Sequence, residues 1–171
     1  MYILNFKVIF YEIVNYFVKV SVLSKKLSQN NLLTMSKNSN YHSTNRSKHY
    51  LKCHLIFVCK YRKKLLIGQL KYDMKQLLLN IASKSDFEIE VFESDLDHIH
   101  FLIKYIPRLS ITSIVRKLKQ ESTYHIWRSV HRNYLYTQFW VEKTFWSDGY
   151  FVCSIGEANP NTIKQYILSQ G

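Results

Sequence analysis

The sequence predicts an α+β fold in which helices pack on one side of an antiparallel sheet. Residues 96–105 alternate between polar and apolar side chains, which is the period of a half-buried strand. Residues 70–84 and 111–129 instead place apolar side chains three and four positions apart, as on one face of a helix. The predicted elements follow the order β-α-β-β-α-β-α, which is typical of ferredoxin-like and RRM-like domains.

The first half of the predicted domain contains three strands and one helix. The first strand covers residues 50–60 and is apolar enough to lie in the centre of the sheet. It runs into a basic cluster at residues 60–64, with the sequence Lys-Tyr-Arg-Lys-Lys. The helix at 70–84 follows, and then a second strand at 88–93. The third strand, 96–105, ends before a proline.

The second half begins with a helix at 111–129, for which Ser110 is a suitable N-cap because its hydroxyl can accept a bond from a backbone N–H. Residues 139–150 are rich in aromatic side chains and predict two extended pieces, separated by a turn at 147–149. The second of these pieces, 150–155, is the last predicted strand.

The composition describes one globular, strongly basic domain. The 171 residues are 47% hydrophobic and 21% charged, which excludes a disordered or low-complexity chain. The 24 Lys and Arg residues against 12 Asp and Glu residues give a formal charge of +12, which predicts a polyanionic partner. Nucleic acid is the first candidate and an anionic membrane surface the second, and a basic surface without a partner is the plain alternative. Three cysteines without a Cys-x-x-Cys pair indicate neither a disulfide framework nor structural zinc, and they favour a reducing, intracellular setting.

The first 35 residues differ from the rest of the chain. Residues 1–23 are apolar but interrupted by polar and charged side chains, so they predict neither a secretory signal nor a spanning helix. An amphipathic segment that lies on a membrane is one alternative. The preferred interpretation is that translation begins at Met35, which makes the residues before it an over-extended reading frame. Residues 36–47 are then a flexible linker, and 48–171 the functional domain.

Two histidines lie close together on the third strand, in the stretch Asp-His-Ile-His at 97–100. Successive side chains of a strand point to opposite faces, so His98 and His100 share one face while Ile99 and Phe101 point to the core. Two neighbouring imidazoles are half of a metal site. The plain alternative is a strand that carries two solvated histidines.

The last predicted helix carries the second half of a candidate site. Asn159 and Pro160 predict its start, and it continues to about Gln170. Tyr166 and Gln170 are four residues apart and therefore lie on one face of the helix. A Tyr hydroxyl is a poor nucleophile at pH 7 because its pKa is about 10, but a divalent cation on the phosphate it attacks makes it competent. Taken singly, a packing role for Tyr166 and a solvated side chain for Gln170 are the simpler interpretations.

Five segments, in order and at consistent spacing, make these separate signals specific. They are the first strand with its following basic stretch, 46–66, the His-hydrophobic-His strand 97–103, the helical stretch 110–122, the aromatic-Gly-Tyr segment 145–152 and the helix 162–170. Together they resemble the HUH single-tyrosine transposases of small insertion sequences, the TnpA-type family that includes the REP-associated tyrosine transposases. The resemblance covers the chain from about Asn45 to Gly171.

The resemblance implies that His98 and His100 are metal ligands, that Gln170 is a third ligand and that Tyr166 is the nucleophile, with Mg²⁺ or Mn²⁺ as the cofactor. The family cuts single-stranded DNA at the ends of its element, forms a 5′-phosphotyrosine and rejoins strands through the released 3′-OH. The expected partners are single-stranded DNA with subterminal hairpins and a second copy of the chain, in a homodimer that can share its active sites between protomers. The expected location is the cytoplasm, at the nucleoid.

The predicted DNA contacts are the basic side chains Arg62, Lys63, Lys64, Lys117 and Lys119. The chain ends one residue after Gln170, where family members often continue further. This leaves a second interpretation, a catalytically decayed domain that only binds single-stranded nucleic acid. A peripheral membrane protein attached through residues 1–23 is the third.

Overall fold

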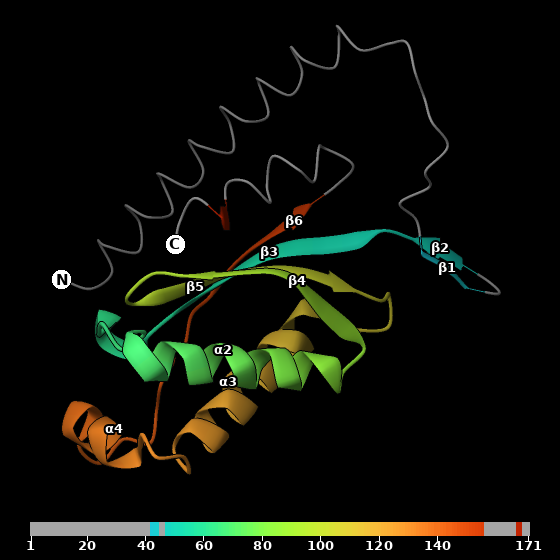
Figure 1. Ribbon diagram of the computed structural model, residues 1–171. Coiled ribbons are helices and arrows are strands. Elements are labelled where there is room, and N and C mark those ends of the chain that lie inside the picture. Colours follow the sequence, from blue (N-terminus) through green and yellow to red (C-terminus); the bar gives the residue numbers. More distant parts are fainter. Residues whose placement is uncertain (1–41, 45–46, 156–166, 169–171) are drawn as a thin grey trace, which may run out of the picture. The chain divides into compact units, whose positions relative to one another are not determined.

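The computed structural model describes residues 42–44, 47–155 and 167–168 (Figure 1). The predicted N-terminal extension, 1–35, lies outside these residues. So does most of the predicted last helix, including Tyr166 and Gln170.

A four-stranded antiparallel sheet forms the centre of the described part. Its strands, in sequence order, are β3 (Leu51–Val58), β4 (Phe87–Ser94), β5 (His98–Tyr105) and β6 (Phe151–Ile155). In space the order is β4-β5-β3-β6, and each neighbouring pair is antiparallel. The first and third of the four strands are therefore central, as in the ferredoxin-like plan, and the predicted α+β class is confirmed.

Two helices, α2 (Gly68–Ser83) and α3 (Ile111–Ile126), contact each other and cover one face of the sheet (Figure 1). The predicted N-cap is confirmed, because Ser110 Oγ accepts a hydrogen bond from the backbone N–H of Ser113 at 3.1 Å. Among the residues that the structure describes, no helix has the length and apolar character needed to cross a membrane.

The core fills the space between the sheet and the two helices. The central strands contribute the fully buried rings of Phe57 and Phe101, whose centroids are 5.1 Å apart. The helices contribute Met74, Leu78 and Leu118 from the opposite side. Removal of these apolar side chains from water is the main stabilising contribution. Because side chains of a strand alternate, the residues between the core positions point to the other face of the sheet.

The chain differs from the prediction after α3. The helix predicted over 111–129 ends at Ile126, and a separate helix, α4 (Arg132–Phe139), follows it. This helix has eight residues and buries only Leu135 and Phe139. Two buried apolar positions four residues apart are too few to reveal a helical period in the sequence.

The first of the two extended pieces predicted within 139–150 is wrong, because Phe139 is helical and no strand follows it before β6. Among residues 140–149, all of which are described, only Trp146 makes a β-bridge, to Cys59. Backbone bonds from Lys60 N to Phe145 O and from Ser147 N to Val58 O, both at 2.8 Å, hold the segment beside the end of β3. In addition, Trp146 Nε1 donates to Ser122 Oγ of α3 at 2.9 Å. The second extended piece is confirmed as β6.

A short antiparallel pair precedes the main sheet. It consists of β1 (His42–Thr44) and β2 (Ser47–His49). Strand pairing therefore begins inside the segment, 36–47, that the sequence predicted as a linker.

Ser122→Ala should lower the free energy of unfolding by about 1–3 kcal/mol, because the buried indole N–H of Trp146 would lose its acceptor. Ser83→Ala is the matched control, since Ser83 Oγ donates to the Asn80 carbonyl on an exposed surface. Urea unfolding of both variants measures the difference. An unchanged unfolding midpoint in Ser122→Ala would contradict the assigned hydrogen bond.

Candidate active site

β5 places His98 and His100 on the same face of the sheet, as the alternation predicted. The centroids of the two rings are 5.1 Å apart and the rings are inclined by 65°. Ile99, between them, is fully buried in the core on the opposite face. His98 is half-buried, whereas His100 is buried. The pair therefore offers one imidazole near the surface and one beneath it.

Asp97 orients the ring of His98. Its Oδ1 lies 2.7 Å from His98 Nδ1, and its Oδ2 lies 2.8 Å from Arg62 Nε. A carboxylate only accepts hydrogen bonds, so this arrangement assigns the proton of His98 to Nδ1 and leaves the lone pair on Nε2. A histidine that donates one ring N–H to a carboxylate is set up to bind a metal through the other nitrogen.

An unusual backbone conformation brings Arg62 to Asp97. A 3-10 turn, η1 (Lys60–Arg62), follows β3, and within it Tyr61 and Arg62 have φ values of 60° and 56°. Non-glycine residues seldom adopt this left-handed region, so the surrounding contacts must hold them there. One such contact is the backbone bond from Cys59 N to Asp97 O, at 2.8 Å. This bond joins the turn before β5 to the residue that directly precedes η1.

A third histidine, His54, lies beside His100. Its Nε2 is 3.0 Å from His100 Nδ1, and the two rings stack with their centroids 5.2 Å apart. One of the two nitrogens must donate and the other accept. When His100 presents Nε2 to a metal, its Nδ1 holds the proton and donates to His54 Nε2. His54 then orients His100 much as Asp97 orients His98.

Burial keeps the two inner histidines neutral. Loss of hydration lowers the pKa of His54 to about 4. It also lowers the pKa of His100 to about 3, with smaller contributions from the positive charges of His54 and His98. Neutral imidazole is the form that binds metals, so protons do not compete for these nitrogens at neutral pH.

Carboxylates adjoin the same end of β5. Asp95, Asp97 and His98 can each bring one ligand atom within 4.8 Å of the others. Oxygen and imidazole donors suit a divalent cation such as Mg²⁺ or Mn²⁺ better than a soft metal. Because Asp97 already accepts a bond from His98, its contact there is that of an orienting group. The donor atoms around His98 therefore fit a divalent metal.

The histidine-bearing face of the sheet also contacts the C-terminal part of the chain. Leu102 lies two residues after His100 and so shares its face. It forms a small buried cluster with Ile155 and Ile167, against which Val91 packs. The described part of the C-terminal segment is thus anchored on the side of the sheet that carries the histidines.

The five basic residues predicted as DNA contacts have different surroundings. Arg62 forms an ion pair with the buried Asp97, and Lys117 forms one with Glu121 on the surface of α3. Lys119 donates to three backbone carbonyls, and burial lowers its pKa to about 8. Lys63 lies over an aromatic ring, and Lys64 is exposed. Contact of these side chains with DNA stays a prediction.

Comparison with known proteins identifies the family. Residues 47–170 match the family model of IS200-like transposases. The chain belongs to this family. The ISDra2 transposase TnpA of Deinococcus radiodurans is 30% identical over 120 residues, which cover 70% of this chain and 84% of that protein. The transposase of insertion sequence element IS200 from Salmonella typhimurium is 29% identical over 125 residues, with 70% and 76% covered. A crystal structure described as that of a transposase from D. radiodurans R1 superposes with a TM-score of 0.61 at 26% identity, over 75% of this chain and 97% of the other.

Membership in the IS200-like transposase family confirms the predicted resemblance and makes the chain a DNA-cleaving enzyme of transposition. The positive charge of the sequence fits a DNA substrate. Tyr166, the predicted nucleophile, and Gln170, the predicted third ligand, lie outside the described residues, so both roles stay predictions.

Sequence reasoning missed His54 and gave Asp97 no role. The first omission has a clear cause: His54 sits in an apolar strand, and only the pairing of that strand with β5 brings it to His100. For Asp97, its position directly before the histidine pair was an available signal. The ion pair of Arg62 with Asp97 joins residues 35 positions apart and had no local signal.

The neutral state of His54 predicts a stability that decreases in weak acid. Its pKa is about 4 in the folded protein, against an ordinary value of 6.5. Below pH 6.5 the unfolded chain therefore binds a proton that the folded chain does not. The free energy of unfolding should fall between pH 6.5 and 4, by up to about 3 kcal/mol from this residue.

In His54→Leu, where that proton is absent, the decrease with acid should be shallower. Urea unfolding from pH 7.5 to 4.5 in metal-free buffer measures both slopes. Equal slopes in the wild type and the variant would show that His54 is not held neutral by the fold.

Proposed function

We propose that this IS200-like transposase cleaves and rejoins single-stranded DNA through a covalent bond between the DNA and Tyr166. The proposal places a divalent cation, Mg²⁺ or Mn²⁺, at His98 and His100, with Gln170 as the third protein ligand. The observation that carries it is the histidine pair itself: two imidazoles on one strand, each with its second nitrogen held by a neighbouring side chain.

The protein prepares both histidines to act as ligands. Asp97 fixes the proton of His98 on Nδ1, and the contact with His54 allows the proton of His100 to lie on Nδ1 as well, with His54 Nε2 as its acceptor. Both Nε2 atoms then carry lone pairs. A bound Mg²⁺ or Mn²⁺ would polarise a phosphate oxygen and stabilise the negative charge that develops on it.

Tyr166 supplies the nucleophile in this proposal. Its phenolic oxygen forms a bond to the phosphorus of the scissile phosphodiester, and the bond from phosphorus to the 3′ oxygen breaks. The phenolic proton passes to solvent, and the released 3′ oxygen takes up a proton. The products are a 5′-phosphotyrosine and a 3′-OH. Attack of a 3′-OH on that phosphotyrosine exchanges the same two bonds in reverse and joins strands, so no nucleotide cofactor is consumed.

The described end of the chain supports this role for Tyr166. Ile167, which follows it directly, is buried against Leu102, and Leu102 is two residues from His100. We further propose that the enzyme recognises DNA hairpins near the ends of its element and works as a homodimer. In such a dimer, Tyr166 of one protomer can serve the histidines of either protomer.

Asp97→Asn should weaken Mn²⁺ binding by about 10- to 100-fold, because an amide no longer fixes the tautomer of His98. Asp73→Asn is the matched control, since Asp73 makes the same kind of bond to His131, at 2.6 Å, on another part of the surface. Titration calorimetry with Mn²⁺ compares the two variants. Wild-type affinity in Asp97→Asn would exclude an orienting role for this carboxylate.

Tyr166→Phe should abolish covalent attachment to DNA, because the variant lacks the attacking oxygen. Labelled single-stranded oligonucleotides, tiled across the DNA that flanks the coding sequence, are incubated with the protein and Mg²⁺ and resolved on denaturing gels. Tyr72→Phe, on the exposed side of α2, is the control and should form the adduct normally.

His98→Ala should reduce adduct formation in the same assay by about 100-fold or more, through lost stabilisation of charge on the phosphate. An adduct that persists in Tyr166→Phe would refute the nucleophile assignment. Undiminished cleavage by His98→Ala would remove the metal from the proposal.

A further inference from the structure

A basic groove lies between α3 and the chain segment 143–148, with a volume of about 630 Å³. Four cationic side chains and a single carboxylate line it, namely Arg116, Lys119, Arg128, Lys143 and Asp148. Their formal charges give the groove a net charge of +3 at neutral pH. A concave surface of one sign concentrates ligands of the opposite sign, so the groove favours a polyanion.

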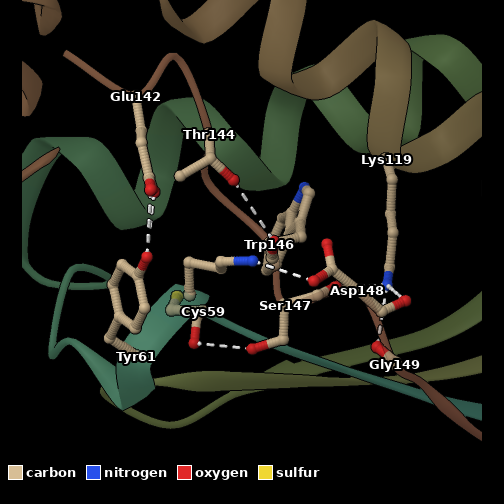
Figure 2. Close-up of polar contacts among 10 residues, drawn as sticks. Cys59, Tyr61, Lys119, Glu142, Thr144, Trp146, Ser147, Asp148 and Gly149 are labelled. Atoms are coloured by element: carbon tan, nitrogen blue, oxygen red, sulfur yellow. Dashed lines mark hydrogen bonds and ion pairs between the residues drawn. The ribbon is translucent and has the colours of Figure 1, made fainter.

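Internal contacts fix the wall of this groove. Lys119 Nζ donates to the carbonyls of Ser147, Asp148 and Gly149 at 2.6, 3.1 and 2.8 Å (Figure 2). The carboxylate of Asp148 pairs with Lys60 at 2.9 Å. The groove is therefore shaped before a ligand binds, and its one negative charge is already paired.

The other three cations are accessible to solvent, although the guanidinium of Arg128 also lies on the ring of Tyr124. Arg116, Arg128 and Lys143 are all exposed. Within the part of the chain that the structure describes, none of them forms an ion pair. Phosphate groups are the natural counterions for such side chains in a DNA-cleaving enzyme, and their binding would release condensed salt ions.

Aromatic rings line the same groove and indicate which form of DNA fits it. Tyr124 is 52% exposed, and the Arg128 guanidinium lies 3.5 Å from the centroid of its ring. Trp127 and Trp146 are buried in the wall, with their indole N–H groups bonded inside the protein. Unpaired bases stack on such rings and on guanidinium planes, whereas the bases of a duplex are already stacked on each other.

The groove is separate from the histidine pair. α3 packs on the face of the sheet that carries Ile99 and Phe101, which is the face opposite to the histidines. The groove and the histidine pair nevertheless both contact η1, the short turn after β3. Lys60 of η1 pairs with Asp148 of the groove, and Arg62 of η1 pairs with Asp97 beside His98.

We propose that this groove binds an unpaired segment of the DNA on which the transposase acts. Bases stack against Tyr124, and Arg116, Arg128 and Lys143 hold the phosphates. The inference rests on the proposed function in taking single-stranded DNA as the substrate. It adds a second DNA contact, on the helical side of the protein and away from the scissile phosphate.

The test measures binding of a fluorescent oligothymidylate of about 20 nucleotides to the full chain by anisotropy, over a series of salt concentrations. The double variant Tyr124→Ala/Arg128→Ala should bind about tenfold more weakly, because a stacked base and a phosphate contact are lost. Arg132→Ala is the matched control: this exposed arginine also lies near a tyrosine ring, 5.5 Å from that of Tyr136, but on α4 and outside the groove. It should bind within about twofold of the wild type.

A second variant is needed in case the two alanine substitutions disturb folding. Arg116→Glu changes one exposed side chain and should weaken oligothymidylate binding by a similar factor, with an unfolding midpoint close to that of the wild type. Losses no larger than that of Arg132→Ala would overturn the inference. Unlabelled competitors give a second check. If a duplex of the same length or polyglutamate displaces the oligothymidylate as effectively as the unlabelled single strand does, the inference is also overturned.

The outcome for the groove can be separated from that for the phosphotyrosine reaction. Wild-type adduct formation together with undiminished binding in the groove variants would refute the groove alone. Weakened binding in those variants, with no adduct from the wild type on any flanking oligonucleotide, would refute the proposed reaction alone.

Discussion

The antiparallel pairing of β3 with β5 is the constraint on which the candidate site depends. In this register Ile56 lies opposite His100, and the two histidines of β5 point away from the helices. A shift of one residue would turn both histidines into the core and expose Ile99 and Phe101, because strand side chains alternate with a period of two. Burial of the apolar face stabilises the fold, and it therefore also determines which side chains lie on the polar face.

On that polar face, charged groups adjoin His98, whereas His54 and His100 are neutral imidazoles. Directly before β5, the buried carboxylate of Asp97 is paired with the guanidinium of Arg62 and with His98. Further along the sheet, His100 contacts the imidazole of His54, and Glu93 of β4 lies opposite His100 in the strand register. Loss of hydration disfavours the charged form of both rings, so His54 and His100 are held as neutral imidazoles that bond to each other. Neutral imidazole is the form that can be buried at low cost, and it is also the form that binds a metal.

The sequence predicted what local periodicity encodes and missed what distant pairing creates. The strand that carries the histidines and the two long helices follow from repeats of two and of three to four residues, and each was found. His54 was missed because Leu55–Val58, which follow it, are apolar on both faces, so the strand does not show the alternation that revealed the histidines of β5. Lys119 and Arg62 have the sequence appearance of solvent-facing charges, yet partners 28 and 35 residues away occupy them. Tertiary contacts of this kind are absent from any single window of sequence.

The turn η1 explains why the basic cluster after β3 is more than a charged loop. Its first residue, Lys60, reaches Asp148, its second, Tyr61, donates to Glu142, and its third, Arg62, reaches Asp97 (Figure 2 shows the contact of Tyr61). Three consecutive side chains that point to three separate partners require a backbone that turns sharply, and the left-handed conformations of Tyr61 and Arg62 provide that turn. The strain of these conformations is tolerated because each contact would be lost if the chain relaxed. Since one end of η1 supports the wall of the basic groove and the other orients His98, the position of this turn sets the geometry of both surfaces at once.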